Sequence, residues 1–462
     1  MVRFFNVYYP VRTLILLCGE ALIICVSFMV AALIRFGPDS SLKLSYEGGI
    51  YKIALASAVC LLCLYYYDLY DSFIFSNPRE VLTRIVQVLG AACLIMAIVY
   101  YLLPKVRLDT GLFIPGILLI GISLAAWRKL FVLLNRSARL ASRAVVLGVG
   151  PLAEALVPEM EHRPEWGVRL VGYVGRADSA IAGNGLRRLG GVADLEAVVG
   201  GERVDQIVIA MSERRGALPV ELLLRLKSQG VLIRDGAEMY ETLTGKVPLE
   251  SLRLSWLLFS RGFRVSRAML VYKRATSIIF SSVGLLLALP LMAVIAAAIR
   301  LDSKGPVLFR QQRLGLRSTI FTLNKFRSMV HGADADGIYR PVQENDNRIT
   351  RVGRWLRRSR LDELPQLWNV LRGDMYFVGP RPFVPNQERE YAEKIPFYAQ
   401  RWSVRPGATG WAQVNREYCA TVEDNVEKLA YDLFYIKNMS VGLDLLIVFK
   451  TIKILLLGRG GR

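Results

Sequence analysis

Residues 361–382 read L-D-E-L-P-Q-L-W-N-V-L-R-G-D-M-Y-F-V-G-P-R-P, and this stretch decides how the rest of the chain is interpreted. Adjacent carboxylates, Asp362 and Glu363, precede a stiff Gly-Pro-Arg-Pro loop at 379–382. A strongly apolar segment, 277–299, lies upstream. Such carboxylates can supply a nucleophile and a metal ligand, and the loop can bind an anion. Together these features predict phosphate chemistry at a membrane surface.

The composition places the chain between soluble and membrane proteins. It has 462 residues, of which 53% are hydrophobic, and its formal net charge is +20. Its mean hydropathy is +0.34. This length allows roughly three units. A basic surface beside a membrane favours anionic lipid headgroups and phosphorylated substrates. Nothing resembles a base-recognition module, so we expect no nucleic-acid partner.

Histidine and cysteine exclude some classes of site. The chain has only two histidines, His162 and His331, which argues against a histidine-based metal site or catalytic triad. Cys60 and Cys63 have C-x-x-C spacing, but they lie inside an apolar run. We interpret them as small hydrophobic residues rather than a zinc or redox site.

The first 138 residues are predicted to form a four-helix transmembrane bundle. Each of four apolar runs is near the length that spans hydrocarbon as a helix; they lie at 13–34, 50–67, 84–103 and 111–134. The fourth run is followed by a basic flank, which favours the cytoplasmic side; its residues are Arg128, Lys129, Arg136, Arg139 and Arg143. Four spans then place the N-terminus in the cytoplasm as well.

Residues 139–250 are predicted to form a Rossmann-like α/β domain. Strands alternate with helical stretches, which predicts a parallel sheet; the expected strands are 144–147, 169–174, 206–210 and 230–234. Gly148, Gly150 and Ala153 give a partial dinucleotide fingerprint. The acidic residue expected after the second strand is missing. We therefore favour a structural turn or a regulatory nucleotide site over catalytic use of NAD.

A basic linker, 251–276, is predicted to lead into a membrane helix at 277–300. Cations flank this segment on both sides, which argues against a simple crossing. Pro290 lacks an amide hydrogen, so a helix should break or kink there. We expect a re-entrant helix broken at Pro290 that enters and returns on the cytoplasmic side. A fifth span with a tolerated proline kink is the alternative.

The remaining residues, 301–462, are predicted to be an α+β catalytic domain. A hairpin is expected from 304–309 and 320–323, and helices are expected at 351–372 and 426–456. On a helix, neighbouring residues point about 100° apart, so Asp362 and Glu363 can flank one small site. One carboxylate can attack phosphorus, and the other can hold Mg²⁺. A simpler explanation is a charge pair that complements a helix dipole.

Several cations lie near these carboxylates in the sequence. Arginines crowd a short stretch before them, either as a phosphate-binding stripe or as a solvated face; they are Arg348, Arg351, Arg354, Arg357, Arg358 and Arg360. Lys325 and Arg327 lie on the same side of an extended segment and could clamp successive phosphates. Two prolines hold Arg381 in a stiff loop, and Arg405 begins another loop at 405–410.

At these motifs the chain resembles the bacterial sugar transferase family, also called monotopic phosphoglycosyl transferases. The resemblance covers about 270–460 and rests on six motifs: S-K-G-P at 303–306, R-L-G at 313–315, K-F-R-S-M at 325–329, L-D-E-L-P-Q at 361–366, G-P-R-P at 379–382 and R-P-G-A-T-G at 405–410. The N-terminal bundle and Rossmann-like unit resemble the large form of the family. The run at 427–438 resembles its exopolysaccharide branch.

The resemblance implies a reaction and residue roles. A UDP-sugar would donate its sugar 1-phosphate to undecaprenyl phosphate, with release of UMP, at the start of surface glycan synthesis. Asp362 would be the nucleophile and would form a covalent phosphosugar intermediate, and Glu363 would bind Mg²⁺. The candidate substrate- and phosphate-binding residues are Lys325, Arg327, Arg381, Arg405 and Gln366. One departure is Leu289 before Pro290, where family members often carry serine.

The expected location is the bacterial inner membrane, with the catalytic domain in the cytoplasm and the lipid bilayer as a partner. The linker and large N-terminal unit leave room for a homodimer. Two other functions stay open. An NAD-dependent sugar-nucleotide modifying enzyme would need an acidic ribose-binding residue and a Tyr-x-x-x-Lys pair within 141–250, and neither is present. A catalytically silent glycan-assembly scaffold would not need the carboxylate pair.

Overall fold

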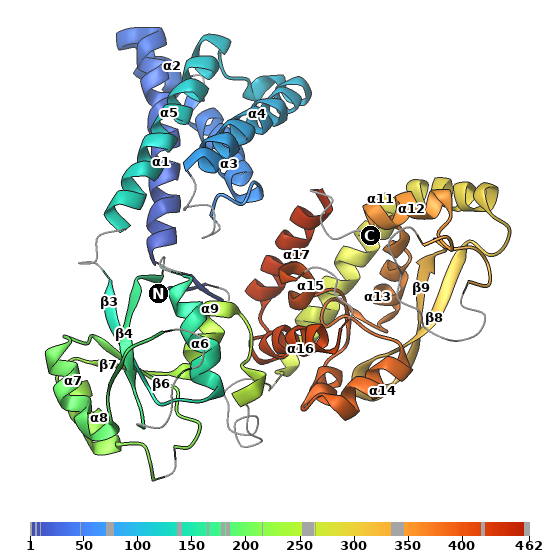
Figure 1. The fold of residues 1–462 in the computed structure, drawn as a ribbon. Helices are drawn as coiled ribbons and strands as arrows, with labels where there is room; N and C mark the ends of the chain where they lie inside the picture. The colour runs from blue at the N-terminus through green and yellow to red at the C-terminus, as the bar shows by residue number, and fades with distance from the viewer. Residues whose placement is uncertain are drawn as a thin grey trace. The chain divides into compact units, whose positions relative to one another are not determined.

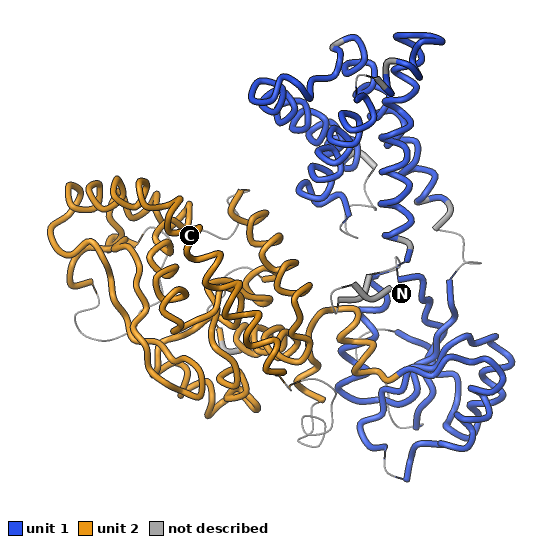
Figure 2. Tube along the Cα trace, turned by 180° about the vertical axis from the view of Figure 1, so that it is seen from behind, with its two compact units in different colours: residues 1–2, 8–234 blue, residues 3–7, 235–462 orange. Residues whose placement is uncertain are grey.

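The structure is a computed structural model of the whole chain. It describes residues 2–4, 7–9, 11–46, 48–70, 78–135, 141–163, 166–176, 181, 185–214, 216–251, 263, 265–333, 346–416 and 421–456. Residues 252–262 and 264 of the predicted basic linker 251–276 lie outside the described residues. Arg136 and Arg139 of the basic flank also lie outside them. The described residues form two compact units (Figure 2), one of residues 1–2 and 8–234 and one of residues 3–7 and 235–462.

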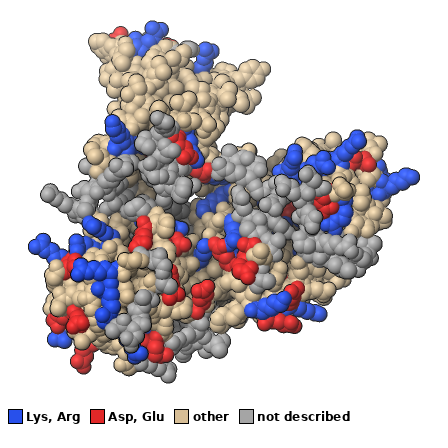
Figure 3. All heavy atoms as spheres, viewed as in Figure 1, with Lys and Arg blue, Asp and Glu red and all other residues tan. Residues whose placement is uncertain are grey.

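The N-terminal unit begins with long apolar helices. These helices are α1 (Val11–Phe36), α2 (Ser40–Tyr46), α3 (Gly49–Tyr66), α4 (Pro78–Leu102) and α5 (Thr110–Asn135). Two short strands precede them in the chain, β1 (Val2–Phe4) and β2 (Val7–Tyr9), and residues 3–7 of this stretch belong to the other unit. The inward side chains of the helices form one apolar cluster. The surface over these helices is largely free of charged side chains except near its ends (Figure 3).

Among the described residues, five helices are long and apolar enough to cross a membrane. Four lie in this bundle, at Thr13–Leu42, Gly49–Tyr66, Glu80–Leu102 and Gly111–Phe131, and the fifth is Arg267–Asp302. Each overlaps a run predicted from the sequence. Inside the bundle Arg128 Nη2 contacts Glu20 Oε1 at 2.6 Å, and Tyr70 donates to Glu20 Oε2 at 2.7 Å. Each of these two buried charges therefore lies against its opposite within the protein, as expected of charged side chains in an apolar helix bundle.

The second part of this unit is a five-stranded sheet in the order β5-β4-β3-β6-β7, typical of a Rossmann-like fold. The pairings of β3 with β4, β3 with β6, and β4 with β5 are parallel. The strands are β3 (Ser142–Leu147), β4 (Val168–Val174), β5 (Arg188–Gly190), β6 (Gln206–Ile209) and β7 (Leu232–Asp235). Helices α7 (Leu195–Gly201) and α8 (Val220–Ser228) cover one side, and α6 (Pro151–Glu161) lies on the other (Figure 1).

The glycine turn between β3 and α6 requires its glycines. Gly148 and Gly150 have φ values of +102° and +140°, a region that other residues rarely adopt. A Cβ on Gly150 would also lie 2.0 Å from Ser212 Oγ. Close packing against the loop after β6 is therefore one reason for Gly150, and the structural turn and the regulatory nucleotide site both stay predictions.

The division between the units falls at residue 235, not at the predicted boundary of 250. Helix α9 (Gly236–Thr244) follows β7 directly, capped by Asp235, whose Oδ1 accepts from Ala237 N at 2.9 Å. Both oxygens of Glu241 then accept from Lys437 at 2.8 Å, and Trp411 donates to Gly245 O at 2.9 Å. These contacts assign the segment after β7 to the second unit, residues 235–462, which contains the predicted catalytic domain.

The long helix α11 (Arg267–Asp302) is capped by Ser266, whose hydroxyl accepts from Met269 N at 3.1 Å. Pro290 lies inside this helix, which is helical throughout. The predicted break at Pro290 is therefore absent. The ribbon of α11 instead changes direction along its length (Figure 1), and a bent helix is compatible with both the re-entrant helix and the fifth span considered in the sequence analysis. The proline removes one hydrogen bond but does not end the helix.

The rest of the second unit is α+β, as predicted. Strands β8 (Leu308–Leu314) and β9 (Ile320–Phe326) form an antiparallel hairpin, longer than expected. Two short strands, β10 (Tyr376–Val378) and β11 (Gly407–Thr409), pair in parallel. The helices are α12 (Arg351–Ser359), α13 (Gln366–Arg372), α14 (Pro385–Lys394), α15 (Trp411–Asn415), α16 (Val422–Lys437) and α17 (Val441–Leu456), with 3-10 turns η9 (Leu361–Glu363) and η10 (Tyr398–Ser403). The predicted helix at 426–456 is thus two helices.

Candidate active site

The paired carboxylates lie in a 3-10 turn between two helices rather than on one continuous helix. The sequence predicted a helix over 351–372, but α12 ends at Arg360, whose φ of 55° is left-handed. Pro365 then precedes α13, and the single turn η9 fills the gap. Asp362 and Glu363 are therefore presented by a short, sharply defined turn that is fixed by helices on both sides.

Two cations hold the carboxylate of Glu363. Lys325 Nζ, from β9, lies 2.9 Å from Glu363 Oε1, and Arg381 Nη2, from the loop after β10, lies 2.8 Å from the same oxygen. The side chains of Glu363, Lys325 and Arg381 are 20%, 19% and 37% exposed, so the cluster is open to solvent on one side. Burial alone would raise the pKa of Glu363, but Arg381 and Lys325 outweigh it and hold this pKa well below the usual range. Glu363 is therefore ionised at neutral pH.

The pKa of Asp362 is shifted in the opposite direction. Burial raises its pKa above the usual value, Lys325 opposes that rise, and the neighbouring Glu363 adds to it. The two adjacent carboxyl groups therefore differ: one is neutralised by ion pairs, and the other is more basic. A more basic carboxylate is the better nucleophile, which makes Asp362 the better candidate for attack on phosphorus.

The two predicted anion-binding loops lie side by side. The loop 379–382 follows β10, whereas the stretch 405–410 contains β11 itself, and Gly379 N donates to Thr409 O at 2.8 Å. A Cβ on Gly407 would lie 2.0 Å from Gly379 N, so only glycine permits this approach of the two backbones. Arg405 lies with its guanidinium 5.4 Å above the ring centre of Tyr376. The structure thus pairs Arg381, and not Arg405, with Glu363.

Arg327 does not join Lys325 at this cluster. It is buried, and it donates to the oxygens that follow the end of α11, at 2.7 Å to Lys304 O, 2.7 Å to Ser303 O and 2.8 Å to Ser303 Oγ. The predicted clamp of Lys325 and Arg327 is therefore not formed: Lys325 contacts Glu363, whereas Arg327 contacts the carbonyls at the helix terminus. This geometry suits a structural role for Arg327, because a helix end leaves carbonyl groups without partners.

The last two predicted residues, Gln366 and Pro290, lie on different helices. Gln366 is the first residue of α13, three positions after Glu363, and it is buried. Pro290 lies within α11, and Gly284 of that helix packs against α13, because a Cβ on Gly284 would lie 3.1 Å from Leu367. Helix α11 therefore packs directly on the helix that follows the carboxylate turn.

A magnesium ion would need ligands beyond the protein's own acidic side chains. Across the residues that the structure describes, no group of three or more His, Cys, Asp or Glu side chains could hold a metal ion. Magnesium often keeps several waters and binds through one or two carboxylates plus substrate phosphates. Asp362 and Glu363 fit that pattern, provided that phosphate oxygens complete the coordination.

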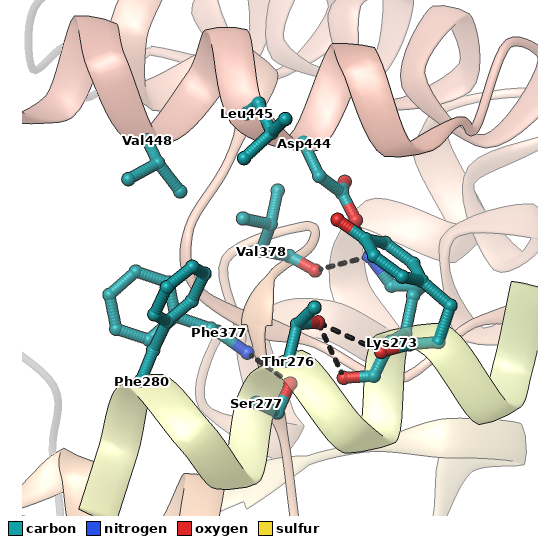
Figure 4. A pocket seen from close by; sticks show the side chains of 10 residues that line it. Lys273, Thr276, Ser277, Phe280, Phe377, Val378, Asp444, Leu445 and Val448 are labelled. Atoms are coloured by element: carbon teal, nitrogen blue, oxygen red, sulfur yellow. Dashed lines mark hydrogen bonds and ion pairs between the residues drawn. The ribbon is translucent and has the colours of Figure 1, made fainter. Parts of the chain in front are cut away.

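One buried cluster escaped the sequence analysis, which counted Lys273 within the basic linker. Lys273 Nζ donates to Val378 O at 3.0 Å and Asp444 Oδ2 at 2.9 Å (Figure 4). Tyr435 also contacts Lys273 Nζ. A small pocket lined by Phe280, Phe377 and Leu445 opens beside it. The available signal was Asp444, the one acidic residue of helix α17, near the start of its long apolar run. This cluster fixes β10 and α17 to α11.

Two known protein families match different parts of the chain. The bacterial sugar transferase family matches residues 268–458, and the CoA-binding domain family matches residues 66–234. The chain is 30% identical over 472 residues to a UDP-glucose:undecaprenyl-phosphate glucose-1-phosphate transferase of Xanthomonas campestris pv. campestris, covering 97% of this chain and 94% of that protein.

Two further relatives match shorter stretches. A UDP-N-acetylgalactosamine-undecaprenyl-phosphate N-acetylgalactosaminephosphotransferase of Aeromonas hydrophila is 42% identical over 225 residues, which are 49% of this chain and 52% of that protein. A UDP-glucose:undecaprenyl-phosphate glucose-1-phosphate transferase of Escherichia coli (strain K12) is 43% identical over 182 residues, 39% of each protein. Because similarity extends over nearly the whole Xanthomonas relative, and the six motifs lie within the matched catalytic unit, the chain belongs to the bacterial sugar transferase family.

Proposed function

We propose that this chain transfers a sugar 1-phosphate from a UDP-sugar to undecaprenyl phosphate, which yields undecaprenyl diphosphate-sugar and UMP and initiates an exopolysaccharide or other surface glycan. The observation that carries the proposal is the Asp362–Glu363 turn with Lys325 and Arg381 within 2.9 Å of Glu363. Phosphoryl transfer depends on positioning and charge neutralisation, and this cluster provides both.

The proposed reaction has two steps at one phosphorus atom. In the first, a carboxylate oxygen of Asp362 attacks the sugar-bearing phosphorus of the UDP-sugar, and the bond from this phosphorus to the bridging oxygen breaks, so UMP leaves with the electron pair. In the second, a phosphate oxygen of undecaprenyl phosphate attacks the same phosphorus, and Asp362 leaves as a carboxylate. The raised pKa of Asp362 favours attack, and its ionised form is a competent leaving group.

The cations around Glu363 are proposed to exchange partners when substrate binds. Lys325 and Arg381 neutralise Glu363 in the free protein and can turn toward the diphosphate, whose charge grows on the departing oxygen. Glu363, together with phosphate oxygens and water, would hold Mg²⁺, which supplies further positive charge to the diphosphate. Arg405 and Gln366 remain proposed substrate contacts, whereas the contacts of Arg327 support a structural role instead.

We also propose that α11 enters and leaves the inner membrane on the cytoplasmic side. Both ends of the helix contact the same compact unit. Near its start Lys273 bonds to Val378 and Asp444, and near its end Ile299 packs with Phe326 in one apolar cluster. Between these ends Leu286 and Leu287 are each 75% exposed, as lipid-facing residues would be. A helix that crossed the membrane would place one end on the far side.

The decisive assay uses the full chain in lipid particles with undecaprenyl phosphate, Mg²⁺ and a panel of UDP-sugars that includes UDP-glucose and UDP-N-acetylgalactosamine. Release of UMP from one donor is the expected result and identifies the sugar. Release of UDP would indicate glycosyl transfer and overturn the proposal. Light scattering of the same preparation tests the proposed homodimer, which predicts twice the mass of the chain.

A further inference from the structure

The loop that carries Arg381 is held at every residue from 379 to 383 by a main-chain hydrogen bond to another part of the catalytic unit. The bonds are Gly379 N to Thr409 O at 2.8 Å, Gly407 N to Pro380 O at 2.9 Å, Arg401 Nη2 to Arg381 O at 2.9 Å, Arg313 Nη1 to Pro382 O at 3.3 Å and Leu314 N to Phe383 O at 3.3 Å. The backbone of Arg381 is therefore fixed while its side chain reaches Glu363.

Arg401 is the buried cation of this set. It lies in η10, and its side chain is 4% exposed. Its Nε donates to Asp432 Oδ2 at 2.8 Å, and its Nη1 donates to Tyr398 Oη at 2.7 Å and Glu388 Oε1 at 3.3 Å. The remaining nitrogen, Nη2, holds Arg381 O. One guanidinium thus connects η10, α14 and α16 to the loop.

Glu388 also binds the backbone of the loop, at Phe383, on the other side of Pro382 from Arg381. Its Oε1 also accepts from Phe383 N at 3.3 Å, and its Oε2 accepts from Trp402 Nε1 at 2.8 Å. Burial alone would lower the pKa of Arg401, but Tyr398, Asp432 and Glu388 raise it above its usual value. Arg401 therefore stays charged, and its planar fork meets four acceptors that lysine could not meet together.

We infer that Arg401 is a positioning residue for the transfer reaction, one that acts through Arg381. It fixes the carbonyl of Arg381, so the guanidinium of that residue lies 2.8 Å from Glu363 before substrate arrives. Because the main chain of Arg381 is fixed, only its side chain has to turn from Glu363 toward the diphosphate, which reduces the reorganisation needed when charge develops there. This role rests on the proposed function.

A double-mutant cycle separates this role from a general contribution to folding. The variants are Arg401→Lys, Arg381→Ala and the double variant, each as the full chain in lipid particles, with kcat for UMP release measured. We expect Arg401→Lys to lower kcat about 10- to 100-fold. In the Arg381→Ala background the same change should have no further effect, because the side chain it places is absent. Effects that multiply in the double variant would overturn the inference.

A second measurement does not depend on the reaction. Hydrogen exchange at the amides of Gly379, Arg381 and Phe383 should accelerate in Arg401→Lys, and unchanged exchange would overturn the inference whether or not UMP is released. Arg143→Lys is the matched control, because Arg143 also bonds to a carbonyl and a carboxylate, both of Glu202, in the other unit. If Arg401→Lys does not fold, Glu388→Gln provides the same tests, because it weakens the acceptor of Phe383 N.

Discussion

The catalytic unit contains two clusters of opposite charges that differ in how completely they are enclosed. Around Glu363, two cations meet one carboxylate oxygen, and the side chains are 19% to 37% exposed. Around Arg401, one cation meets Glu388 and Asp432, and all three side chains are at most 4% exposed. In the closed cluster, each nitrogen of the guanidinium has a partner.

This difference in exposure distinguishes a cluster that can bind substrate from a cluster that only stabilises the fold. A buried charge whose partners are all protein groups cannot release them without a large desolvation cost, so the Arg401 cluster holds shape. An ion pair that is open on one side can exchange a carboxylate for a phosphate of similar charge at lower cost. The Glu363 cluster is therefore the one suited to bind a diphosphate, and variants should affect the two kinds of cluster differently.

The largest effect is expected at the nucleophile. Asp362→Asn should lower transfer by about 10⁴-fold or more, because the amide cannot form the covalent intermediate. The variant should remain folded, since Asp362 lies on a turn fixed by flanking helices. UMP release and thermal unfolding measure the two properties, with the exposed Glu390→Gln as control. Robust turnover by Asp362→Asn would remove the covalent step from the mechanism.

A smaller loss is expected when the open cluster loses its anion. Glu363→Gln should lower kcat about 10²- to 10³-fold, because Lys325 and Arg381 lose the group that orients them and Mg²⁺ loses a proposed ligand. A titration of rate against Mg²⁺ concentration should shift to higher concentrations. If the titration is the same as in the parent chain, Glu363 does not bind the metal.

Removal of Lys325 should change the pH dependence more than the maximum rate. Burial raises the pKa of Asp362, and Lys325 opposes that rise, so Lys325→Met should raise this pKa further. Because the nucleophile must be ionised, activity is lost as the pH falls through this pKa, and the acid limb of the kcat profile should move to higher pH. The maximum rate should fall about tenfold. If the acid limb does not move in Lys325→Met, ionisation of Asp362 does not determine the pH dependence of kcat.

The sequence predicted the parts of this comparison that depend on local pattern. Apolar runs predicted the long apolar helices, and strand–helix alternation predicted the parallel sheet. The Asp362–Glu363 pair and Arg381 were identified because motifs mark them. Whether Lys325 and Arg327 share a partner depends on where α11 ends, since Arg327 bonds to residues 303 and 304. Such long-range packing leaves no periodic signal, and Arg401 was missed for the same reason.

The smallest effect on transfer is expected at a second closed cluster, that of Lys273. Lys273→Met leaves the buried carboxylate of Asp444 without its cation, which should cost about 3–5 kcal/mol of folding stability. The rate per folded molecule should fall less than about tenfold, because β10 keeps its pairing with β11 and no group of the open cluster is removed.

Lys273→Met/Asp444→Leu should recover much of the lost stability, because replacing both charges by apolar groups leaves neither one unpaired. Thermal unfolding in lipid particles measures the stability, and Lys227→Met, on the exposed face of α8, is the control. A large loss of kcat in a stable double variant would show that Lys273 acts in the reaction. In that case enclosure alone would not distinguish supporting clusters from reactive ones, and the division drawn between the Glu363 and Arg401 clusters would fail.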